Sequence, residues 1–313
     1  MFSNTHDLTM SIKTILQKKQ FNQPISLVDV WGECLGNILF GDPHPELYLS
    51  SFRQLTLSGQ YPFPIFTAII PAKINKNLIY DWVEFNPFEM NLEDYHLDVK
   101  YCNSFWVNGK LVKEAPEPSL SQMMGIFSSA FSVNFDDIMR LFGTNYYQKF
   151  LLNQIKNLIQ KFELSNLRLT QGRLLDPFYH SNSNKSVIDL FDAGISYNCP
   201  ILPLLQRQSD IIIYCEASES DVNNLSLMTN YITEQGYPFP NIDFDNFDKD
   251  IPQIFHHNQT PSFIFIPNTK IYSTFKLQYT PEEFDDLYNS MYETTVNFLP
   301  KIIDHFISFI DIN

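Results

Sequence analysis

Residues 187–218 read VIDLFDAGISYNCPILPLLQRQSDIIIYCEAS, and two short apolar runs within this stretch decide the fold class. The runs VIDLFDAG (187–194) and DIIIYCEAS (210–218) are compact and rich in β-branched residues, which is typical of buried strands. Residues 221–235 are predicted to form a helix, and SFIFIP (262–267) a further strand. Strands that alternate with helices favour a layered α/β fold with a mostly parallel sheet.

The rest of the chain extends this pattern. Residues 26–40 repeat apolar side chains at intervals of three and four, which predicts a helix. PIFTAIIPAK (64–73) and LIYDWVEFNP (78–87) predict two neighbouring strands. Residues 91–119 are expected to form an irregular connection, and the polar segment 165–186 a flexible surface loop. Further helices are expected over residues 123–143, 145–163, 281–298 and 300–311.

Composition and charge exclude several classes of protein. The chain has 313 residues, 44% hydrophobic and 18% charged, so it can enclose a core and is too apolar to be disordered. Lysine and arginine total 21 against 35 acidic residues, and the net charge of −14 disfavours nucleic acid and electrostatic adsorption to anionic lipid. No apolar run approaches the roughly 18–20 residues that cross a bilayer, and no signal peptide is predicted. A local apolar patch can still touch a membrane.

The cysteine, histidine and aspartate patterns do not predict a metal site. Four cysteines, at positions 34, 102, 199 and 215, lie far apart, which favours buried thiols in a reducing, cytoplasmic compartment. His256 and His257 adjoin in a loop-like segment without further ligands nearby, so surface histidines are the interpretation. The acidic stretch from Asp243 to Asp250 lacks the glycine and terminal glutamate of a calcium loop and is interpreted as solvated.

Five segments, taken together, are similar to one known family. In this order and at these separations they resemble the C-terminal part of the catalytic domain of the cytosolic group IV phospholipase A2 and fungal phospholipase B (lysophospholipase) family, within the patatin-like superfamily. The resemblance runs from about residue 24 to about residue 298. The segments are EFNPFEM (84–90), MGIFSSAFS (124–132), DLFDAGISYNCPILPLL (189–205), GYPFPNID (236–243) and YSTFKLQYTPEEFDDLY (272–288).

The resemblance implies a fold, a reaction and partners. The fold would be a three-layer α/β/α patatin-like fold, incomplete at the N-terminal side, with residues 1–313 as one partial catalytic domain and residues 1–23 as an N-terminal extension. The reaction would be hydrolysis of phospholipid or lysophospholipid acyl esters by a Ser–Asp dyad, with no cofactor and no metal. The implied partners are the lipid substrate, a membrane touched peripherally, and a second copy or a complementing chain that covers an open sheet edge.

Asp192 is the candidate catalytic residue. In the family the aspartate lies in an Asp-x-Gly motif at the end of a strand, which matches Asp192, Ala193 and Gly194 here. A carboxylate at that place can accept the proton of the nucleophile. Gly194 is expected to support a sharp turn by adopting positive φ. On spacing alone an exposed strand-ending turn would explain the tripeptide equally well, and the flanking match favours the catalytic interpretation.

The family's nucleophile motif is absent from this sequence. The serine of the family sits in a Gly-x-Ser-x-Gly or Gly-x-Ser-x-Ser elbow, and Ser58 in LTLSGQ has Thr56 where the leading glycine would stand. The glycine-rich oxyanion loop and its arginine are not found either. Two further positions depart from the family: Asn91 and Ser128 replace glycines and are tolerated if their φ is negative.

Two hypotheses of different classes follow. In the first, the chain is a carboxylic ester hydrolase by descent that contributes Asp192 and is nearly inert alone, the remainder being lost from a truncated gene or supplied by a separate polypeptide. In the second, it is a non-catalytic lipid-binding or interaction protein on the same scaffold. An aromatic group could line an acyl-chain pocket or belong to the core, and no arginine is assigned to a lipid phosphate. The aromatic group is Phe85, Phe88, Tyr95, Phe105 and Trp106.

Overall fold

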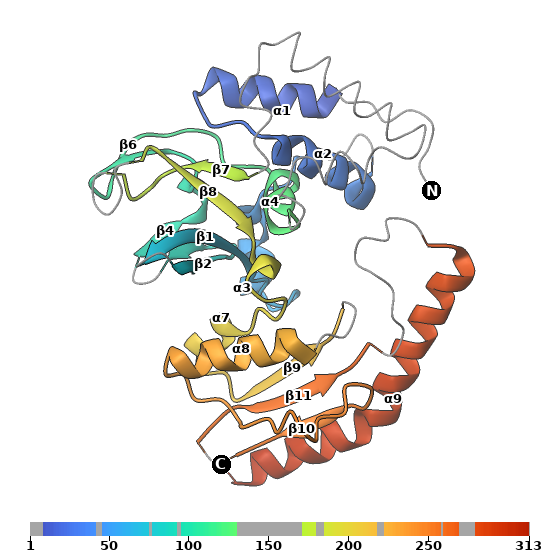
Figure 1. The fold of residues 1–313 in the computed structure, drawn as a ribbon. Coiled ribbons are helices and arrows are strands. Elements are labelled where there is room, and N and C mark those ends of the chain that lie inside the picture. The colour runs from blue at the N-terminus through green and yellow to red at the C-terminus, as the bar shows by residue number, and fades with distance from the viewer. Residues whose placement is uncertain are drawn as a thin grey trace. The chain divides into compact units, whose positions relative to one another are not determined.

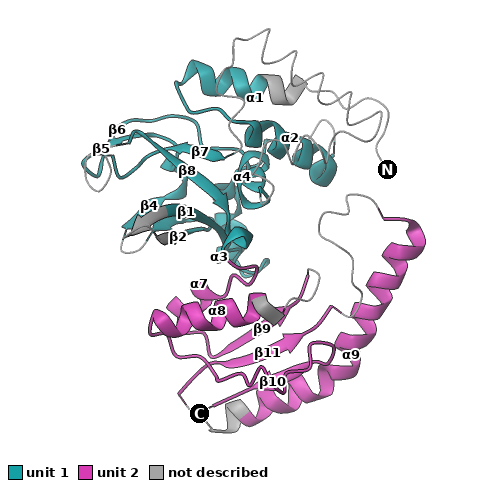
Figure 2. Cartoon of the chain, viewed as in Figure 1, with its two compact units in different colours: residues 1–196 teal, residues 197–313 magenta. Residues whose placement is uncertain are grey.

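The chain divides into two units, residues 1–196 and residues 197–313, which Figure 2 colours teal and magenta. Each unit has a sheet and helices of its own (Figure 1). The expectation that residues 1–313 form one domain stays a prediction. The computed structural model describes residues 9–41, 46–74, 77–92, 95–129, 171–179, 185–217, 222–257, 259–268 and 279–312.

Unit 1 is built on a six-stranded sheet with the strand order β4-β3-β2-β1-β8-β7. β1 pairs with β2 along its whole length and with β8 at Ala68 and Ile69. The described strand pairs of this sheet are antiparallel. The elements of unit 1 are α1 (Thr9–Gln20), α2 (Leu27–Phe40), η1 (Leu49–Phe52), α3 (Arg53–Leu57), β1 (Phe66–Ile74), β2 (Asn77–Phe85), β3 (Glu89–Leu92), β4 (Tyr95–Asp98), η2 (Val99–Tyr101), β5 (Phe105–Val107), β6 (Lys110–Lys113), α4 (Leu120–Phe127), β7 (Gly172–Leu175), β8 (Val187–Asp192) and η5 (Ala193–Ile195).

The prediction of a mostly parallel sheet is wrong for unit 1. β1 ends at Ile74 and β2 begins at Asn77, while β3 ends at Leu92 and β4 begins at Tyr95. Links this short join antiparallel strands, because a parallel pair needs a crossover of about a dozen residues or more. The two strands expected over 64–73 and 78–87 are nevertheless confirmed as the β1–β2 pair.

Two segments that were predicted without regular structure contain strands. Residues 91–119 include β4 and the β5-β6 hairpin, so the irregular connection is wrong. β4 and β6 are largely exposed, and β5, although apolar and half-buried, is only three residues long, so none of them forms an apolar run long enough to mark a strand. Part of the surface loop predicted over 165–186 forms β7, in which Leu174 is fully buried.

The helices of unit 1 follow the sequence pattern in part. α2 confirms the helix predicted over 26–40. The helix predicted over 123–143 begins earlier, at Leu120, because Ser119 and Gln122 form a capping box there, and α4 ends at Phe127. Residues 130–170 lie outside the described residues, and with them the helix predicted over 145–163.

Unit 2 has a three-stranded sheet with the order β10-β11-β9. β9 and β11 are parallel, whereas β10 and β11 are antiparallel. Every residue of β11 is buried, so both faces of this strand are covered. In Figure 1, α8 and α9 lie on opposite sides of the sheet, which gives unit 2 the expected α/β/α layers. The elements are α7 (Leu202–Gln206), β9 (Ile211–Cys215), α8 (Val222–Glu234), β10 (Gln253–Phe255), β11 (Ser262–Ile266) and α9 (Pro281–Ile312).

α9 is one helix of 32 residues where the sequence predicts two. Pro300 lies inside it and has no N–H to donate to the carbonyl of Val296. The helix continues through this position because it is anchored on both sides of the proline: Phe298 and Ile302 are buried against β11. Tertiary packing therefore outweighs the local cost of the proline.

Two glycines determine how closely α2 and α4 pack in unit 1. A Cβ atom added at Gly125 would lie 2.6 Å from the carbonyl oxygen of Val28 and 2.8 Å from the Cα of Gly32. A Cβ atom at Gly32 would in turn overlap the carbonyl oxygen of Ser121. The two backbones can approach this closely only because both residues lack a side chain. The helix pair contacts β1, β7 and β8, and thereby forms the layer behind the central strands.

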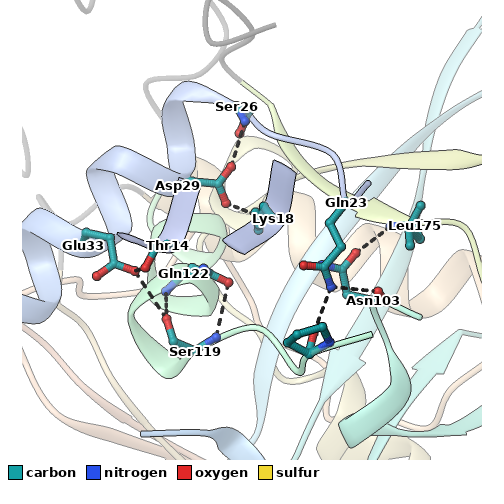
Figure 3. A network of polar contacts seen from close by, with 11 residues as sticks. Thr14, Lys18, Gln23, Ser26, Asp29, Glu33, Asn103, Ser119, Gln122 and Leu175 are labelled. Carbon is teal, nitrogen blue, oxygen red and sulfur yellow. Dashed lines mark hydrogen bonds and ion pairs between the residues drawn. The ribbon is translucent and has the colours of Figure 1, made fainter. Parts of the chain in front are cut away.

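A buried polar network joins α1 to α2 (Figure 3). The Nζ of Lys18 lies 2.5 Å from the Asp29 carboxylate, and the two side chains expose only 3% and 7% of their surface. Asp29 also accepts the N–H of Ser26 at 2.7 Å and so caps α2. The Thr14 hydroxyl donates to buried Glu33 at 2.9 Å. The segment 1–23, expected to be an extension, thus contributes α1 to the packed part of unit 1.

A second part of the network reaches the sheet. The side-chain amide of Gln23 donates to the carbonyl oxygens of Asn103 and Pro116 at 3.0 and 2.9 Å. The side-chain oxygen of Asn103 accepts the N–H of Leu175 in β7 at 2.8 Å (Figure 3). The turn between α1 and α2 is therefore tied to the strand beside β8.

The glycine contact predicts an inverted effect of alanine. In an ordinary helix interior Gly→Ala stabilises by roughly 0.5–1 kcal/mol, but at Gly125 the new methyl group would meet backbone atoms that cannot rotate away. We expect Gly125→Ala to lower the free energy of unfolding by about 1–3 kcal/mol, measured by urea denaturation. Ile38→Ala, on the exposed side of α2, is the control and should change stability by at most about 0.5 kcal/mol. A Gly125→Ala chain as stable as the parent would contradict this packing.

The buried ion pair predicts a large cost when one partner is removed. Lys18→Met keeps the length of the side chain but leaves the Asp29 carboxylate buried without its cation. We expect a loss of about 3–5 kcal/mol in the free energy of unfolding. Lys110→Met removes the same charge from an exposed position on β6 and should cost no more than about 0.5 kcal/mol. Equal denaturation midpoints for the two variants would show that the pair is not desolvated.

Candidate active site

Asp192 is the last residue of β8 and directly precedes the short helix η5. Its side chain accepts the N–H of Gly194 at 2.7 Å and so caps the short helix η5. Its backbone is held by pairing with Ala68 of β1, which is fully buried. The pairing with β1 holds the backbone of Asp192, and the hydrogen bond from Gly194 orients its carboxylate. The residue nevertheless remains partly accessible to solvent.

The register places Asp192 on the core-facing side of the sheet. Residues opposite each other in antiparallel strands share a face, and so do residues two apart. Asp192 therefore shares its face with Ala68 and Leu190, both of which belong to the buried core that α2 and α4 cover. The rings of Phe66 and Phe127 stack beside this region with centroids 4.9 Å apart. The candidate carboxylate lies on the side of the sheet that is largely apolar.

Gly194 does not adopt the conformation that the sequence suggested. It lies within η5, outside the left-handed region, so the expected positive φ is wrong. Its N–H is instead the donor that orients Asp192, a contact that needs no special φ. The role of Gly194 beside Asp192 as a supporting turn stays a prediction.

The two positions where glycine is replaced are accommodated by ordinary backbone. Ser128 follows α4 with φ −118°, and its hydroxyl donates to the carbonyl of Met124 at 2.7 Å. Asn91 lies in β3, opposite His96 of β4. Neither residue has positive φ, so the condition under which the sequence analysis tolerated them is met.

A cavity of about 570 Å³ lies beside β7 and β8 in unit 1. Phe191 and Asp189 of β8 line it, together with Asp176 and Lys185 from the neighbouring segments. Asp192 is not among its lining residues. The structure therefore separates two groups on β8: Asp192 on the core-facing side, and Asp189 with Phe191 on the cavity. The sequence analysis did not single out these four residues, although they lie close together between positions 176 and 191; other lining residues, such as Ile70 of β1 and Asp81 of β2, come from strands far from them in the chain.

The five aromatic residues named from the sequence do not gather at one place: some belong to the core, one lines the cavity, and Phe88 and Phe105 are in neither set. Phe85 is fully buried in the core, and Trp106 packs against it. Tyr95 lines the cavity and contacts Phe178 with ring centroids 5.0 Å apart. Phe88 stacks with Phe63 at 6.0 Å. Phe85 therefore belongs to the core, whereas Tyr95 lies beside the cavity.

The histidines form a contact that sequence spacing did not indicate. His256 and His257 are exposed, as predicted, but His256 Nδ1 also lies 2.9 Å from the buried hydroxyl of Ser262. His305 Nε2, from α9, lies 2.8 Å from the same hydroxyl. Burial, with His256 nearby, lowers the pKa of His305. Because His305 is 43 residues from Ser262, no local pattern could reveal the cluster.

The remaining polar candidates agree with the sequence in most respects. The four aspartates between positions 243 and 250 are exposed, which confirms a solvated acidic loop. In the described ranges, no three His, Cys, Asp or Glu side chains are placed to hold a metal ion. Cys102 and Cys199 are buried as predicted, whereas Cys215 is exposed. Burial, with the charge of Glu33, raises the pKa of Cys34 to about 12, so this thiol is protonated at neutral pH.

One observation concerns membranes directly. Among the helices that the structure describes, none is both long enough and apolar enough to cross a membrane.

Comparison with known sequences gives the family. The model of the lysophospholipase catalytic domain family matches residues 1–238. Human cytosolic phospholipase A2 epsilon is 23% identical over 305 residues, which cover 76% of this chain and 35% of that protein. Human cytosolic phospholipase A2 zeta is 23% identical over 291 residues, which cover 72% and 34%. The chain thus spans about a third of the length of these relatives.

Comparison with solved structures supports the fold. Human GIVD cytosolic phospholipase A2 superposes with a TM-score of 0.68 at 19% identity, covering 90% of this chain and 45% of that one. A second structure of the human GIVD enzyme, in complex with methyl gamma-linolenyl fluorophosphonate and terbium chloride, gives a TM-score of 0.59 at 20% identity over 90% of this chain and 40% of that one. With a family match over most of its length, the chain belongs to the lysophospholipase catalytic domain family and has its patatin-like α/β fold.

Proposed function

We propose that this chain carries the general-base half of a Ser–Asp centre that hydrolyses the acyl esters of phospholipids or lysophospholipids. The observation that supports the proposal is the position of Asp192: a strand-end carboxylate, oriented by the N–H of Gly194, inside the segment that matches the family. The relatives named above are cytosolic phospholipases, so we place the activity in the cytoplasm, at the surface of a membrane that supplies the lipid.

The chemistry assigned to Asp192 is a proton transfer in each direction. The carboxylate accepts the proton of a serine hydroxyl as its oxygen attacks the ester carbonyl carbon, which forms an acyl-serine when the alcohol leaves with that proton. Asp192 then takes a proton from water as the water oxygen attacks the acyl-serine carbonyl carbon, and it returns this proton to the serine oxygen when the bond to serine breaks and the fatty acid leaves. The Gly194 N–H holds the carboxylate in place through both steps.

The sequence lacks the partner that this base requires. It contains no Gly-x-Ser-x-Gly motif, and the leading position before Ser58 is Thr56. Removing a serine nucleophile costs on the order of a million-fold in turnover, and each lost oxyanion donor a further hundred-fold or more. We therefore propose that residues 1–313 alone release no fatty acid.

A second candidate function has one observation in its favour. The same absence of a serine elbow would suit a lipid-binding or interaction protein that keeps the fold without the reaction. This candidate predicts saturable association with phospholipid vesicles. It also predicts that this association does not depend on the charge of Asp192.

A segment graft tests the role of Asp192 separately from the missing serine. Residues 187–205 replace the matching segment of human GIVD cytosolic phospholipase A2, and fatty-acid release from lysophosphatidylcholine is measured. We expect the graft to retain activity and Asp192→Asn to lower kcat by about 10,000-fold, because the amide can still accept the Gly194 N–H but cannot take a proton. Asp189→Asn, a carboxylate on the cavity side of the same strand, is the matched control and should leave kcat nearly unchanged.

The outcomes are distinct. If Asp192→Asn and Asp189→Asn behave alike in an active graft, Asp192 is not the base. If the purified chain itself hydrolyses lysophosphatidylcholine and Asp192→Asn abolishes this activity, the proposed inertness is wrong. Thermal melts of the parent chain and of Asp192→Asn should agree, which shows that the substitution acts on chemistry and not on folding.

A further inference from the structure

The cavity beside β8 lies where the sheet of unit 1 opens between two strands. Among the described residues, β1 pairs with β8 only at Ala68 and Ile69, although β1 continues for five more residues. Pro71 has no N–H with which to extend the ladder. The cavity of about 570 Å³ occupies the gap that results, because Ile70 and Pro71 on one side and residues 187–189 of β8 on the other line it.

The size and lining of the cavity suit a small organic molecule. Ligand pockets in proteins usually enclose roughly 300–1,000 Å³ and combine a mainly apolar lining with a few polar groups. Apolar and aromatic side chains form most of the lining here, and the polar groups are three aspartates, Gln171 and Lys185. The nature of these polar groups therefore determines which class of molecule fits.

One of the aspartates, Asp176, has a buried oxygen without a partner. The residue lines the cavity and exposes only 2% of its surface. Its Oδ1 accepts the N–H of Phe178 at 2.8 Å, whereas its Oδ2 has no hydrogen-bond partner among the described residues. A buried carboxylate that is only partly compensated is costly, because it has lost its hydration. A cation in the cavity would compensate it without touching the shielded oxygen, since charges interact over several ångströms in a poorly solvated site.

The charges around the cavity leave one negative charge in excess. Asp81, Asp176 and Asp189 contribute three carboxylates to the lining. Arg173 balances Asp189, because its Nε lies 2.9 Å from that carboxylate, and Lys185 supplies a second positive charge. The remaining charge favours a monovalent cation and disfavours an anion such as a phosphate or a fatty-acid carboxylate.

Aromatic rings determine which kind of cation fits. Tyr95 and Phe178 line the cavity with ring centroids 5.0 Å apart and planes inclined at 58°, and Phe191 adds a third ring. The faces of aromatic rings attract cations, and cages of such rings recognise alkylated ammonium groups. A metal ion is a poorer match, because hard cations require several oxygen ligands, and in the part of the chain that the structure describes no three acidic, His or Cys side chains converge to hold one.

From these observations we propose that the cavity between β1 and β8 binds an alkylated ammonium ion with one positive charge, attracted by Asp176 and enclosed by the rings of Tyr95 and Phe178. The ammonium group can belong to a free small molecule or to a lipid headgroup, because the same groups would recognise both. Asp192 is not among the lining residues, so this proposal and the activity proposed for Asp192 can each fail without the other.

Ligand-observed NMR of the full chain tests the site with choline chloride. Saturation transfer to the choline methyl protons should appear and should level off as choline is added. The uncharged analogue 3,3-dimethylbutan-1-ol has the same shape with carbon in place of nitrogen, and it should bind about tenfold more weakly or worse. Glycerophosphocholine presents the same ammonium group as a lipid headgroup does. Tighter binding of glycerophosphocholine than of choline assigns the site to a headgroup, and the reverse order assigns it to a free cation.

Variants of the lining test which groups hold the cation. Asp176→Asn keeps an oxygen for the Phe178 N–H but removes the charge, and it should weaken choline binding about tenfold. Tyr95→Leu removes one ring at a partly exposed position and should weaken binding about two- to fivefold, whereas Tyr95→Phe should bind like the parent. Glu114→Gln is the matched control, because it removes a charge from an exposed residue outside the lining, and it should also bind like the parent.

Thermal melts separate loss of binding from loss of folding. Asp176→Asn is expected to melt with the parent; if it does not fold, the comparison of Tyr95→Leu with Tyr95→Phe decides. A parent chain that binds neither choline nor glycerophosphocholine overturns the proposal. So does a chain that binds the uncharged analogue as tightly as choline, or equal choline affinity in folded Asp176→Asn and Glu114→Gln.

Discussion

The packing of unit 1 depends most on a close contact between two glycine backbones. α2 and α4 meet where Gly32 and Gly125 leave no room for a Cβ atom, and this helix pair forms the layer behind β1, β7 and β8. β8 is short, and it ends at Asp192 with a pairing to β1 that spans two residues. The position of the carboxylate thus depends on helices far from it in sequence, because their packing holds the strand that carries it.

Around this contact most buried polar groups are paired, although Asn37 Oδ1 and Asn103 Nδ2 have no hydrogen-bond partner among the described residues. Lys18 and Asp29 join α1 to α2, and Gln23 and Asn103 connect the following turn to β7. An incomplete network of this kind lowers the stability of the fold, because an unpaired buried charge loses its hydration without compensation. These paired groups determine how the helices are positioned, while burial of the apolar core supplies most of the driving force for folding. Asp192 differs from them in being partly accessible at the end of its strand.

The elements with strong periodicity could be predicted from the sequence, whereas the role of Asp192 as a site residue stays a prediction. The strands at 187–194, 210–218 and 262–267 and the helix α2 have apolar patterns that local sequence alone determines. The antiparallel order of unit 1 was missed because strand direction depends on which partners meet, not on periodicity. β4 and β6 were missed because their side chains are mostly exposed, and β5 was missed because its apolar run is only three residues long. The contact of His305 with Ser262 joins residues that only the tertiary fold brings together.

The central claim is that Asp192 activates a serine that this sequence does not contain. The most direct measurement is the rate at which a fluorophosphonate inhibitor inactivates human GIVD cytosolic phospholipase A2 after its matching segment is replaced by residues 187–205. This reaction reports nucleophile activation without substrate turnover. The account predicts rapid phosphonylation in the graft and a rate lowered by several orders of magnitude in Asp192→Asn. Equal rates for the two proteins would contradict it.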